Sequence, residues 1–390
     1  MARNLERIDA LRSLKRHKLI FCTLLVASAI RVLGSAWLFY LLSPGGHFHT
    51  PWMDANPQLI PEWSSALNPS KSSEWLWLFN AWDSPHFQLI AQSGYTFPDY
   101  AYLPGYPILI RLTGLLVGNY WIGGLIVTQV FALAGFVAFQ LLAEQYMQPR
   151  EAFCATLLMA AFPYVSVFTT LCYSEAIFLF STVSTWYLYK KGRLVASSLL
   201  AGLASVTRIY GIVIVLPMLL EIIKSKQYRK LHCSVVPVGF LGLWFVFCYF
   251  STGDPLATMT DEKWFTSNIS SHFGLIQTIM NQLFREHVGA VAVPFYIDPP
   301  ILIALSLFAY LVVKSWQVDR LLSAYALTLF AAVIVVVTNQ LSVLRYLAFV
   351  FPIWLTIRVR NLFIVAACVV LFSFMTWLLW LYAINVTFIG

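Results

Sequence analysis

Apolar runs of membrane-spanning length recur along this chain from residue 19 to its C-terminus. Hydrophobic residues make up 59% of the 390 residues and charged residues only 11%, a composition that excludes an ordinary soluble domain. The basic residues, which give a net charge of +8, sit in short clusters between the apolar runs, so they indicate membrane topology rather than nucleic-acid binding. The sequence therefore predicts an all-α polytopic membrane protein.

The lengths of the apolar runs predict about eleven transmembrane helices. The first extends from about residue 19 to 42 and carries Arg31 near its middle, where an ionisable group costs at least ~2.5 kcal/mol in lipid and should face protein or water. The run at 107–117 has about half the length of a crossing, and we place it at the interface or in a re-entrant segment. The other ten expected crossings are residues 121–144, 152–171, 173–189, 195–206, 209–223, 234–251, 297–313, 321–338, 343–357 and 362–387.

The distribution of Lys and Arg predicts which loops face the cytoplasm. With 107–117 outside, every basic cluster falls on one side, which the positive-inside rule assigns to the cytoplasm together with the basic N-terminus 1–18. We expect the first span to be retained rather than cleaved as a signal peptide. A single membrane domain over 19–390 then has long outer loops at 44–120 and 252–296. The cytoplasmic clusters are Arg150, 190–193, 224–230, 314–320 and 358–360.

The first outer loop contains residues 80–87, where an acid and an imidazole lie close in sequence. Asp83 precedes Ser84-Pro85, a pair that suits the first turn of a helix, and His86 follows one turn later on the same face. The helix dipole favours a charged carboxylate there, so Asp83 is predicted to be ionised at neutral pH and to act as a general base. The alternative role is an ordinary N-cap, which is common for an Asp before a helix.

Polar residues from later loops should gather on the same outer face. Arginine binds phosphate in a forked geometry and keeps its charge when half buried, so Arg208 and Arg345, with Arg31, are candidates to bind a substrate phosphate. Snorkelling at the membrane interface is the alternative for Arg208 and Arg345, and Glu175 has an alternative role as a structural partner for one of them. The candidate substrate-binding residues are His86, Tyr173, Glu175, Arg208, Arg345, Tyr346 and Arg31.

Motifs for soluble cofactors are missing from this sequence. It contains no Walker A motif, no G-x-G-x-x-G after a strand, no H-E-x-x-H and no D-x-D, and the missing D-x-D weakens the case for a nucleotide-sugar donor held through a metal. Its six cysteines are scattered singly through apolar segments, without metal-ligand spacing. We therefore expect no cofactor, although Asp83 and Glu175 could share a divalent metal ion.

Several short motifs, taken in order, resemble the PIG-V family of mannosyltransferases and its shorter prokaryotic relatives. These motifs are Trp82-Asp83-x-x-His86-Phe87, Gly94-Tyr95, Leu103-Pro104-Gly105-Tyr106-Pro107, Tyr173-Ser174-Glu175, Thr207-Arg208-x-x-Gly211, Gly253-Asp254-Pro255-Leu256-Ala257 with Trp264, and Arg345-Tyr346 before Phe351-Pro352. The resemblance implies a GT-C architecture, a helical bundle with its catalytic site in the first extracytoplasmic loop. It also implies Asp83 as the catalytic base and a polyprenyl-phosphate sugar donor such as dolichyl-phosphate mannose.

These observations lead to a hypothesis of inverting glycosyl transfer. Asp83 would deprotonate an acceptor hydroxyl on a lipid-linked or cell-surface glycan, and that hydroxyl would displace the polyprenyl phosphate from a hexose, which the resemblance implies is mannose. The rival class is a lipid flippase or solute transporter, which predicts internal symmetry between two halves. We expect a prokaryotic cytoplasmic membrane, with the endoplasmic reticulum membrane as the alternative, and a cytoplasmic N-terminus.

Overall fold

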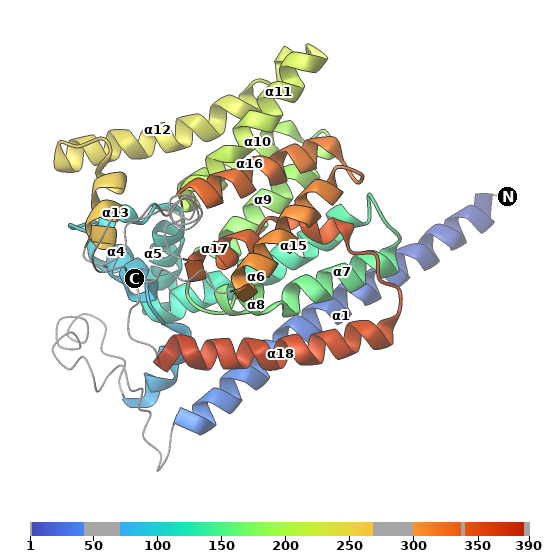
Figure 1. The fold of residues 1–390 in the computed structure, drawn as a ribbon, viewed down its shortest axis with the longest axis horizontal. Helices are drawn as coiled ribbons and strands as arrows, with labels where there is room; N and C mark the ends of the chain where they lie inside the picture. Colours follow the sequence, from blue (N-terminus) through green and yellow to red (C-terminus); the bar gives the residue numbers. More distant parts are fainter. Residues whose placement is uncertain (1, 43–70, 268–298, 337–339, 386–390) are drawn as a thin grey trace, which may run out of the picture. The chain divides into compact units, whose positions relative to one another are not determined.

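A computed structural model describes residues 2–42, 71–267, 299–336 and 340–385 (Figure 1). The described residues form helices and no strand, so the all-α prediction is confirmed for them. The expected outer-loop segments 44–70 and 268–296 lie outside the described residues. The chain divides into two compact units: unit 1 comprises 1–95, 104–193 and 357–389, and unit 2 comprises 96–103, 194–356 and residue 390.

Unit 1 is a bundle built around α6. Helices α5 and α9 pack against α6, α4 packs against α5, and both α1 and α18 pack against α7. The helices of this unit are α1 (Ala2–Leu42), η2 (Lys71–Phe79), α4 (Ser84–Ser93), α5 (Gly105–Val117), α6 (Tyr120–Ala143), α7 (Pro149–Ala161), α8 (Pro163–Phe168), α9 (Glu175–Lys190) and α18 (Leu362–Asn385).

Small residues and a capped turn bring α5 and α6 close together. A Cβ on Gly123 would lie 2.7 Å from the backbone nitrogen of Gly114, so only glycine permits this approach. The Asn119 side chain caps α6 by accepting hydrogen bonds from the backbone N–H groups of Trp121 and Ile122. This pairing places α5, and with it α4, at the N-terminal end of α6.

The opposite end of α6 carries the charged residues of unit 1. Arg16 Nε lies 2.8 Å from a Glu144 oxygen, and Arg360 Nε lies 2.7 Å from a Glu151 oxygen. Helices α6 and α9 begin at the end that holds α4, and Lys190 closes α9 at the charged end. Those basic residues of the predicted cytoplasmic clusters that belong to unit 1 therefore lie at the opposite end of that unit from the Asp83 stretch. The side of the membrane on which each end lies stays a prediction.

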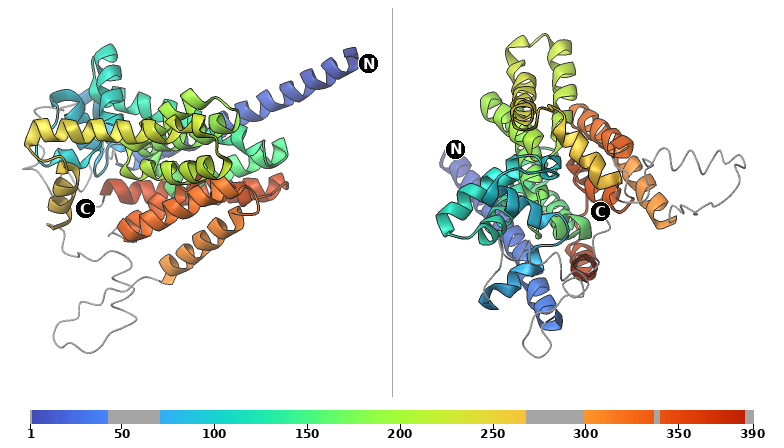
Figure 2. Two further views of the ribbon diagram at one scale, coloured as in Figure 1. Left: turned by 90° about the horizontal axis from the view of Figure 1, so that it is seen from above. Right: turned by 90° about the vertical axis from the view of Figure 1, so that its left-hand side faces the viewer.

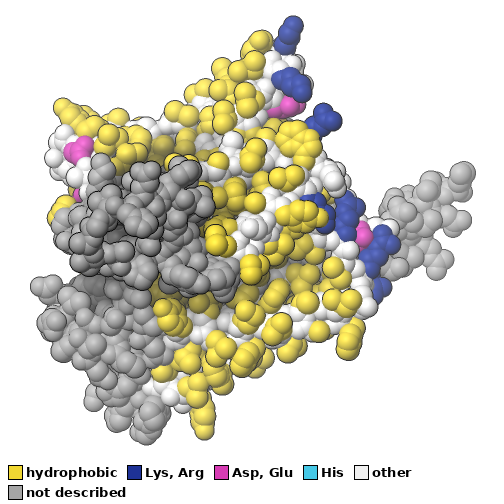
Figure 3. All heavy atoms as spheres, viewed as in Figure 1, with side chains coloured by type: hydrophobic (Ala, Val, Ile, Leu, Met, Phe, Trp, Pro, Cys, Tyr) yellow, Lys and Arg dark blue, Asp and Glu magenta, His cyan; other side chains and the backbone are white. Residues whose placement is uncertain are grey.

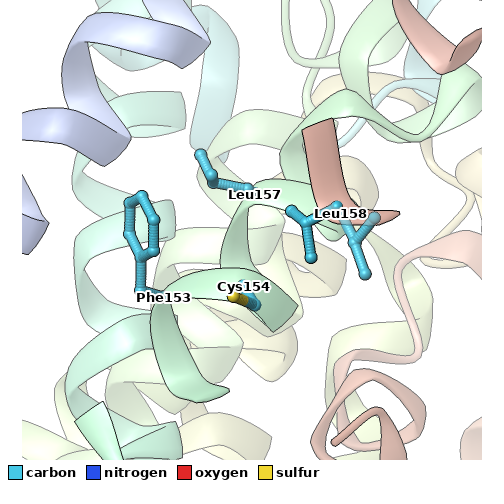
Figure 4. Packing of buried hydrophobic residues seen from close by; sticks show 5 residues of the cluster. Phe153, Cys154, Leu157 and Leu158 are labelled. Carbon is cyan, nitrogen blue, oxygen red and sulfur yellow. The ribbon is translucent and has the colours of Figure 1, made fainter. Parts of the chain in front are cut away.

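An apolar cluster joins α7 to α18 in the interior of the same unit. It consists of Phe153, Cys154, Leu157 and Leu158 from α7, which Figure 4 shows, together with Val365 from α18. In a bilayer it is the close packing of such side chains, and not their removal from water, that holds two helices together.

Unit 2 contains the remaining helices. Helix α10 packs against α12, η3 against α13, and α15 against α16, a pair that Figure 2 shows side by side in orange. The elements are η3 (Asp99–Ala101), α10 (Leu194–Thr207), η4 (Ile209–Ile214), α11 (Val215–Ser225), η5 (Tyr228–Lys230), α12 (His232–Thr252), α13 (Ala257–Ser267), α15 (Pro299–Ser315), α16 (Arg320–Val336), α17 (Gln340–Ala348) and η6 (Phe351–Thr356).

Four of the described helices are long and apolar enough to cross a membrane: Arg16–Leu42, Tyr120–Ala143, Tyr228–Thr252 and Leu362–Ile384. Hydrophobic side chains also cover much of the described surface visible in Figure 3. The chain is thus a membrane protein, and the eleven crossings stay a prediction.

Several expected spans are broken into shorter elements. The run 152–171 divides between α7 and α8 because Pro163 forces Phe162 out of the helical region, with ψ of 129°. The run 209–223 opens with the 3₁₀ turn η4, and 343–357 ends in η6. The short run at 107–117 lies within the 13-residue α5, and its interfacial or re-entrant place stays a prediction.

Candidate active site

Asp83 lies on a tight turn directly before α4. Trp82 adopts φ of 51°, and a left-handed residue other than glycine costs about 1–2 kcal/mol. Asp83 itself is helical in conformation, and Pro85 fixes the first turn of α4, as the sequence predicted. Among the described residues the Asp83 side chain makes no hydrogen bond that caps α4. The Asp83 carboxylate therefore does not act as the N-cap of α4, which was the alternative role predicted from the sequence.

The segment between α8 and α9 holds this turn in place. The backbone N–H of Asp83 donates a 2.8 Å hydrogen bond to the Tyr173 hydroxyl, and the N–H of Cys172 donates a 2.7 Å bond to the carbonyl of Phe79. The Trp82 ring stacks on Phe168 at 5.7 Å between centroids. Two hydrogen bonds and one ring contact thus hold the chain at Asp83 and just before it.

The other candidates in unit 1 differ in exposure. His86 is partly exposed like Asp83, and its backbone N–H donates to the Asp83 carbonyl at 3.1 Å, so the two lie on one turn as predicted. Tyr173 and Glu175 are buried, and Glu175 is the first residue of α9. Among the described residues no group of three or more acidic, His or Cys side chains is arranged to hold a metal ion.

Arg31 is buried inside unit 1 with 5% of its surface exposed. Its guanidinium donates to the Ala27 carbonyl at 2.7 Å and to the Thr169 hydroxyl at 2.8 Å, and it lies 5.2 Å from the centre of the Phe136 ring. The expectation that this arginine faces protein rather than lipid is confirmed. Its predicted part in phosphate binding stays a prediction.

Unit 2 brings together the other three candidates around one aromatic ring. The guanidinium carbon of Arg208 lies 4.4 Å from the centre of the Tyr346 ring, and that of Arg345 lies 4.9 Å from the same centre. Tyr210 packs its ring 5.3 Å from Tyr346. Arg345 is only 8% exposed. Two arginines thus share one ring, where cation–π attraction opposes the repulsion between their charges.

Glu262, which is exposed, lies near enough to Arg208 to interact with it electrostatically. Phosphate is a natural ligand for the arginine pair, because each guanidinium offers a fork of N–H donors.

A buried polar network beneath α4 was not foreseen from the sequence. The Gln88 side-chain amide donates to the Asn80 side-chain oxygen at 2.5 Å, and the Asn80 amide donates to the Leu76 carbonyl at 2.8 Å. Nearby, the Tyr106 hydroxyl bonds to the Gly124 carbonyl and the Thr128 hydroxyl. Helical spacing does not reveal this contact, because Asn80 lies before the turn and only Gln88 belongs to α4.

A second unforeseen contact lies in unit 2. The buried Asp261 carboxylate accepts a 3.0 Å hydrogen bond from the backbone N–H of Tyr100, and the Tyr100 ring packs against Trp244. Burial raises the pKa of Asp261, although the Tyr100 N–H opposes that rise. Residues 96–103, which the sequence placed within the catalytic loop, therefore pack with unit 2.

The fold has a counterpart among solved structures. The Archaeoglobus fulgidus oligosaccharyltransferase in its apo form superposes with a TM-score of 0.53 and 12% sequence identity, covering 95% of this chain and 56% of that chain. At this level of identity the likeness concerns the fold alone, which this chain shares with that oligosaccharyltransferase.

Curated relatives match part of the chain at higher identity. The GPI alpha-1,6-mannosyltransferase 2 of Rattus norvegicus is 36% identical over 144 residues. The enzyme of the same name is 36% identical over 150 residues in Cricetulus griseus and 31% identical over 145 residues in Homo sapiens. Each match covers 34% of this chain. Each alignment spans only 29% of the relative's length. The family described as Mannosyltransferase (PIG-V) matches residues 47–234, the stretch that holds Asp83, His86, Tyr173, Glu175 and Arg208. The predicted resemblance to the PIG-V mannosyltransferases is thereby confirmed over residues 47–234.

Proposed function

We propose that this chain is a membrane glycosyltransferase that transfers mannose from a polyprenyl-phosphate donor, such as dolichyl-phosphate mannose, to a hydroxyl of a lipid-linked or cell-surface glycan. The observation that carries the proposal is the Asp83 turn. A partly exposed carboxylate, unused in capping, stands on a strained and anchored turn inside the stretch that matches the mannosyltransferase family. Strained turns of this kind cluster at active sites.

Asp83 is the general base of the proposed reaction. It takes the proton of the acceptor hydroxyl as the oxygen forms a bond to the anomeric carbon of mannose. The bond from that carbon to the phosphate oxygen breaks, and polyprenyl phosphate leaves with its electron pair. The configuration at the anomeric carbon inverts. A positioned base of this kind typically contributes ~10²- to 10⁴-fold in rate.

Arg208 and Arg345 bind the donor phosphate in this proposal. Their guanidinium groups are held over one ring, so their geometry is set before the donor arrives. Preorganised charge in a partly dehydrated site is worth more than the same charge in water. Tyr346 contributes by orienting the pair. The PIG-V relatives are named for GPI, and we propose a mannose-bearing glycolipid as the acceptor class, in the endoplasmic reticulum or a prokaryotic cytoplasmic membrane.

The test uses the purified protein in lipid nanodiscs with radiolabelled dolichyl-phosphate mannose as donor. Membranes from cells that lack the protein supply acceptors, and labelled glycolipids are separated by thin-layer chromatography. The proposal expects label to move from the donor to a glycolipid. If sealed proteoliposomes of the same protein moved intact donor across the bilayer and no label was transferred, the protein would be a flippase and the proposal would be overturned.

A further inference from the structure

We propose that Tyr173 is a positioning residue for Asp83, and that its hydroxyl fixes the turn that carries the catalytic carboxylate. This inference rests on the proposed function, because it gives Tyr173 a role only if Asp83 acts as the base. It also replaces the substrate contact expected of Tyr173 with a contact to the protein backbone.

The Tyr173 hydroxyl meets Asp83 at its backbone rather than at its side chain. The Asp83 N–H donates to that hydroxyl at 2.8 Å, across 90 positions of sequence. Tyr173 is fully buried, and its ring packs edge-on against Phe87 of α4 at 6.1 Å and against Phe168 at 5.3 Å. Apolar contacts from α4 and α8 thus hold the Tyr173 ring, and the Tyr173 hydroxyl is directed at the backbone of Asp83, the proposed general base.

The turn needs such a support because of its own conformation. Trp82, one residue before Asp83, has a backbone φ of 51°, a value that residues other than glycine seldom adopt. A strained backbone persists only when its surroundings over-determine it. Phe168 holds the Trp82 ring and Tyr173 holds the next peptide N–H, so the two contacts fix the residues on both sides of that peptide bond. Without the hydroxyl, the peptide can rotate and carry the Asp83 carboxylate with it.

Tyr173→Phe removes the hydroxyl and keeps the ring packing, and Tyr106→Phe is its matched control. Tyr106 is equally buried, lies in the same unit and also packs against Phe87, but its hydroxyl bonds to Gly124, Thr128 and the Cys172 side chain and not to Asp83. Each variant loses one buried tyrosine hydroxyl. Any difference between them in catalysis therefore reports the contact with Asp83.

The experiment measures kcat and KM for dolichyl-phosphate mannose in nanodiscs, with thermal unfolding as the check on folding. Tyr173→Phe should lower kcat by at least about tenfold, since a misplacement of ~1 Å can cost ~10²-fold, while KM stays within about twofold. Tyr106→Phe should stay within about threefold of wild-type kcat. Equal kcat values for the two variants would overturn the positioning role.

A double-mutant cycle separates positioning from any independent role. Asp83→Glu already displaces the carboxylate, so Tyr173→Phe should cost little further in that background. Additive losses would show that Tyr173 acts independently of Asp83 and would overturn the inference.

The Asp83→Asn variant distinguishes a failure of the proposed function from a failure of the positioning role of Tyr173. If folded Asp83→Asn has the wild-type kcat, both the proposed function and the inference are wrong. If Asp83→Asn has a strongly reduced kcat but Tyr173→Phe has the wild-type kcat, only the inference is wrong. If Tyr173→Phe fails to fold, Phe168→Leu takes its place, because it releases the Trp82 side of the same turn.

Discussion

Arg345→Ala should weaken the binding of a prenyl phosphate, with Arg345→Lys restoring only part of it. Arg345 is 8% exposed and its guanidinium is oriented over the Tyr346 ring, so a phosphate there would meet a preformed, largely dehydrated fork. A hydrogen bond to a charged group is worth about 1.5–3 kcal/mol. Losing the fork should therefore cost about 2–3 kcal/mol, which corresponds to ~30- to 150-fold weaker binding.

The lysine variant keeps the charge but offers a point contact instead of two parallel N–H donors. We expect it to bind about fivefold more weakly than wild type, between the alanine variant and the native protein. The assay titrates a water-soluble short-chain prenyl phosphate into protein in nanodiscs and follows binding by thermophoresis. Arg193→Ala is the matched control, because it removes an equal charge from an exposed site at the C-terminal end of α9 and should change affinity less than twofold.

Two results would refute this reasoning. Wild-type affinity in Arg345→Ala would show that no phosphate contact exists at this residue. Wild-type affinity in Arg345→Lys, with a weak alanine variant, would show that simple charge attraction suffices and that the fork has no role.

Two further predictions test the topology and the charged end of unit 1. An impermeant thiol reagent added from outside should modify Lys71→Cys and spare Lys191→Cys, and the reverse pattern would place Asp83 on the wrong face. Hydrogen bonds from the Arg360 side chain and the Gln148 N–H hold the pKa of Glu151 below its usual range. Its stabilising effect is therefore present above the unfolded pKa of about 4.3 and is lost as the pH falls through the lower folded value. Glu151→Gln should thus melt at a lower temperature than wild type at pH 7, with the gap closing below about pH 4, and a gap independent of pH would contradict the ion pair.

Local signals in the sequence were enough to place the Asp83 helix. Ser84-Pro85 marked its first turn, and the three-residue separation of Asp83 and His86 placed both on one turn. The burial of Arg31 followed from the cost of charge in lipid. The gathering of Arg208, Arg345 and Tyr346 was expected from the shared outer face, and the structure brings all three together.

Contacts between distant segments were beyond the reach of the sequence. Phe168 is one aromatic residue among many in an apolar run, and nothing near it indicates that it stacks on Trp82. The hydrogen bond between Tyr173 and Asp83 joins residues 90 positions apart. Its donor is a backbone N–H, which every residue except proline carries, so the residue type at position 83 does not reveal it. Likewise, Asp261 is buried against Tyr100 because residues 96–103 pack with unit 2. Local periodicity in the sequence does not predict such contacts between distant segments.

The most direct test of the central claim is the rate of mannose transfer by Asp83→Asn. The substitution keeps nearly the same volume and removes only the base. The Asp83 side chain makes no capping bond to α4, so the variant loses no helix cap, and thermal unfolding checks that it is folded. We predict that it still binds dolichyl-phosphate mannose but transfers mannose at least ~10²-fold more slowly. Transfer at the wild-type rate by the folded variant would contradict the account.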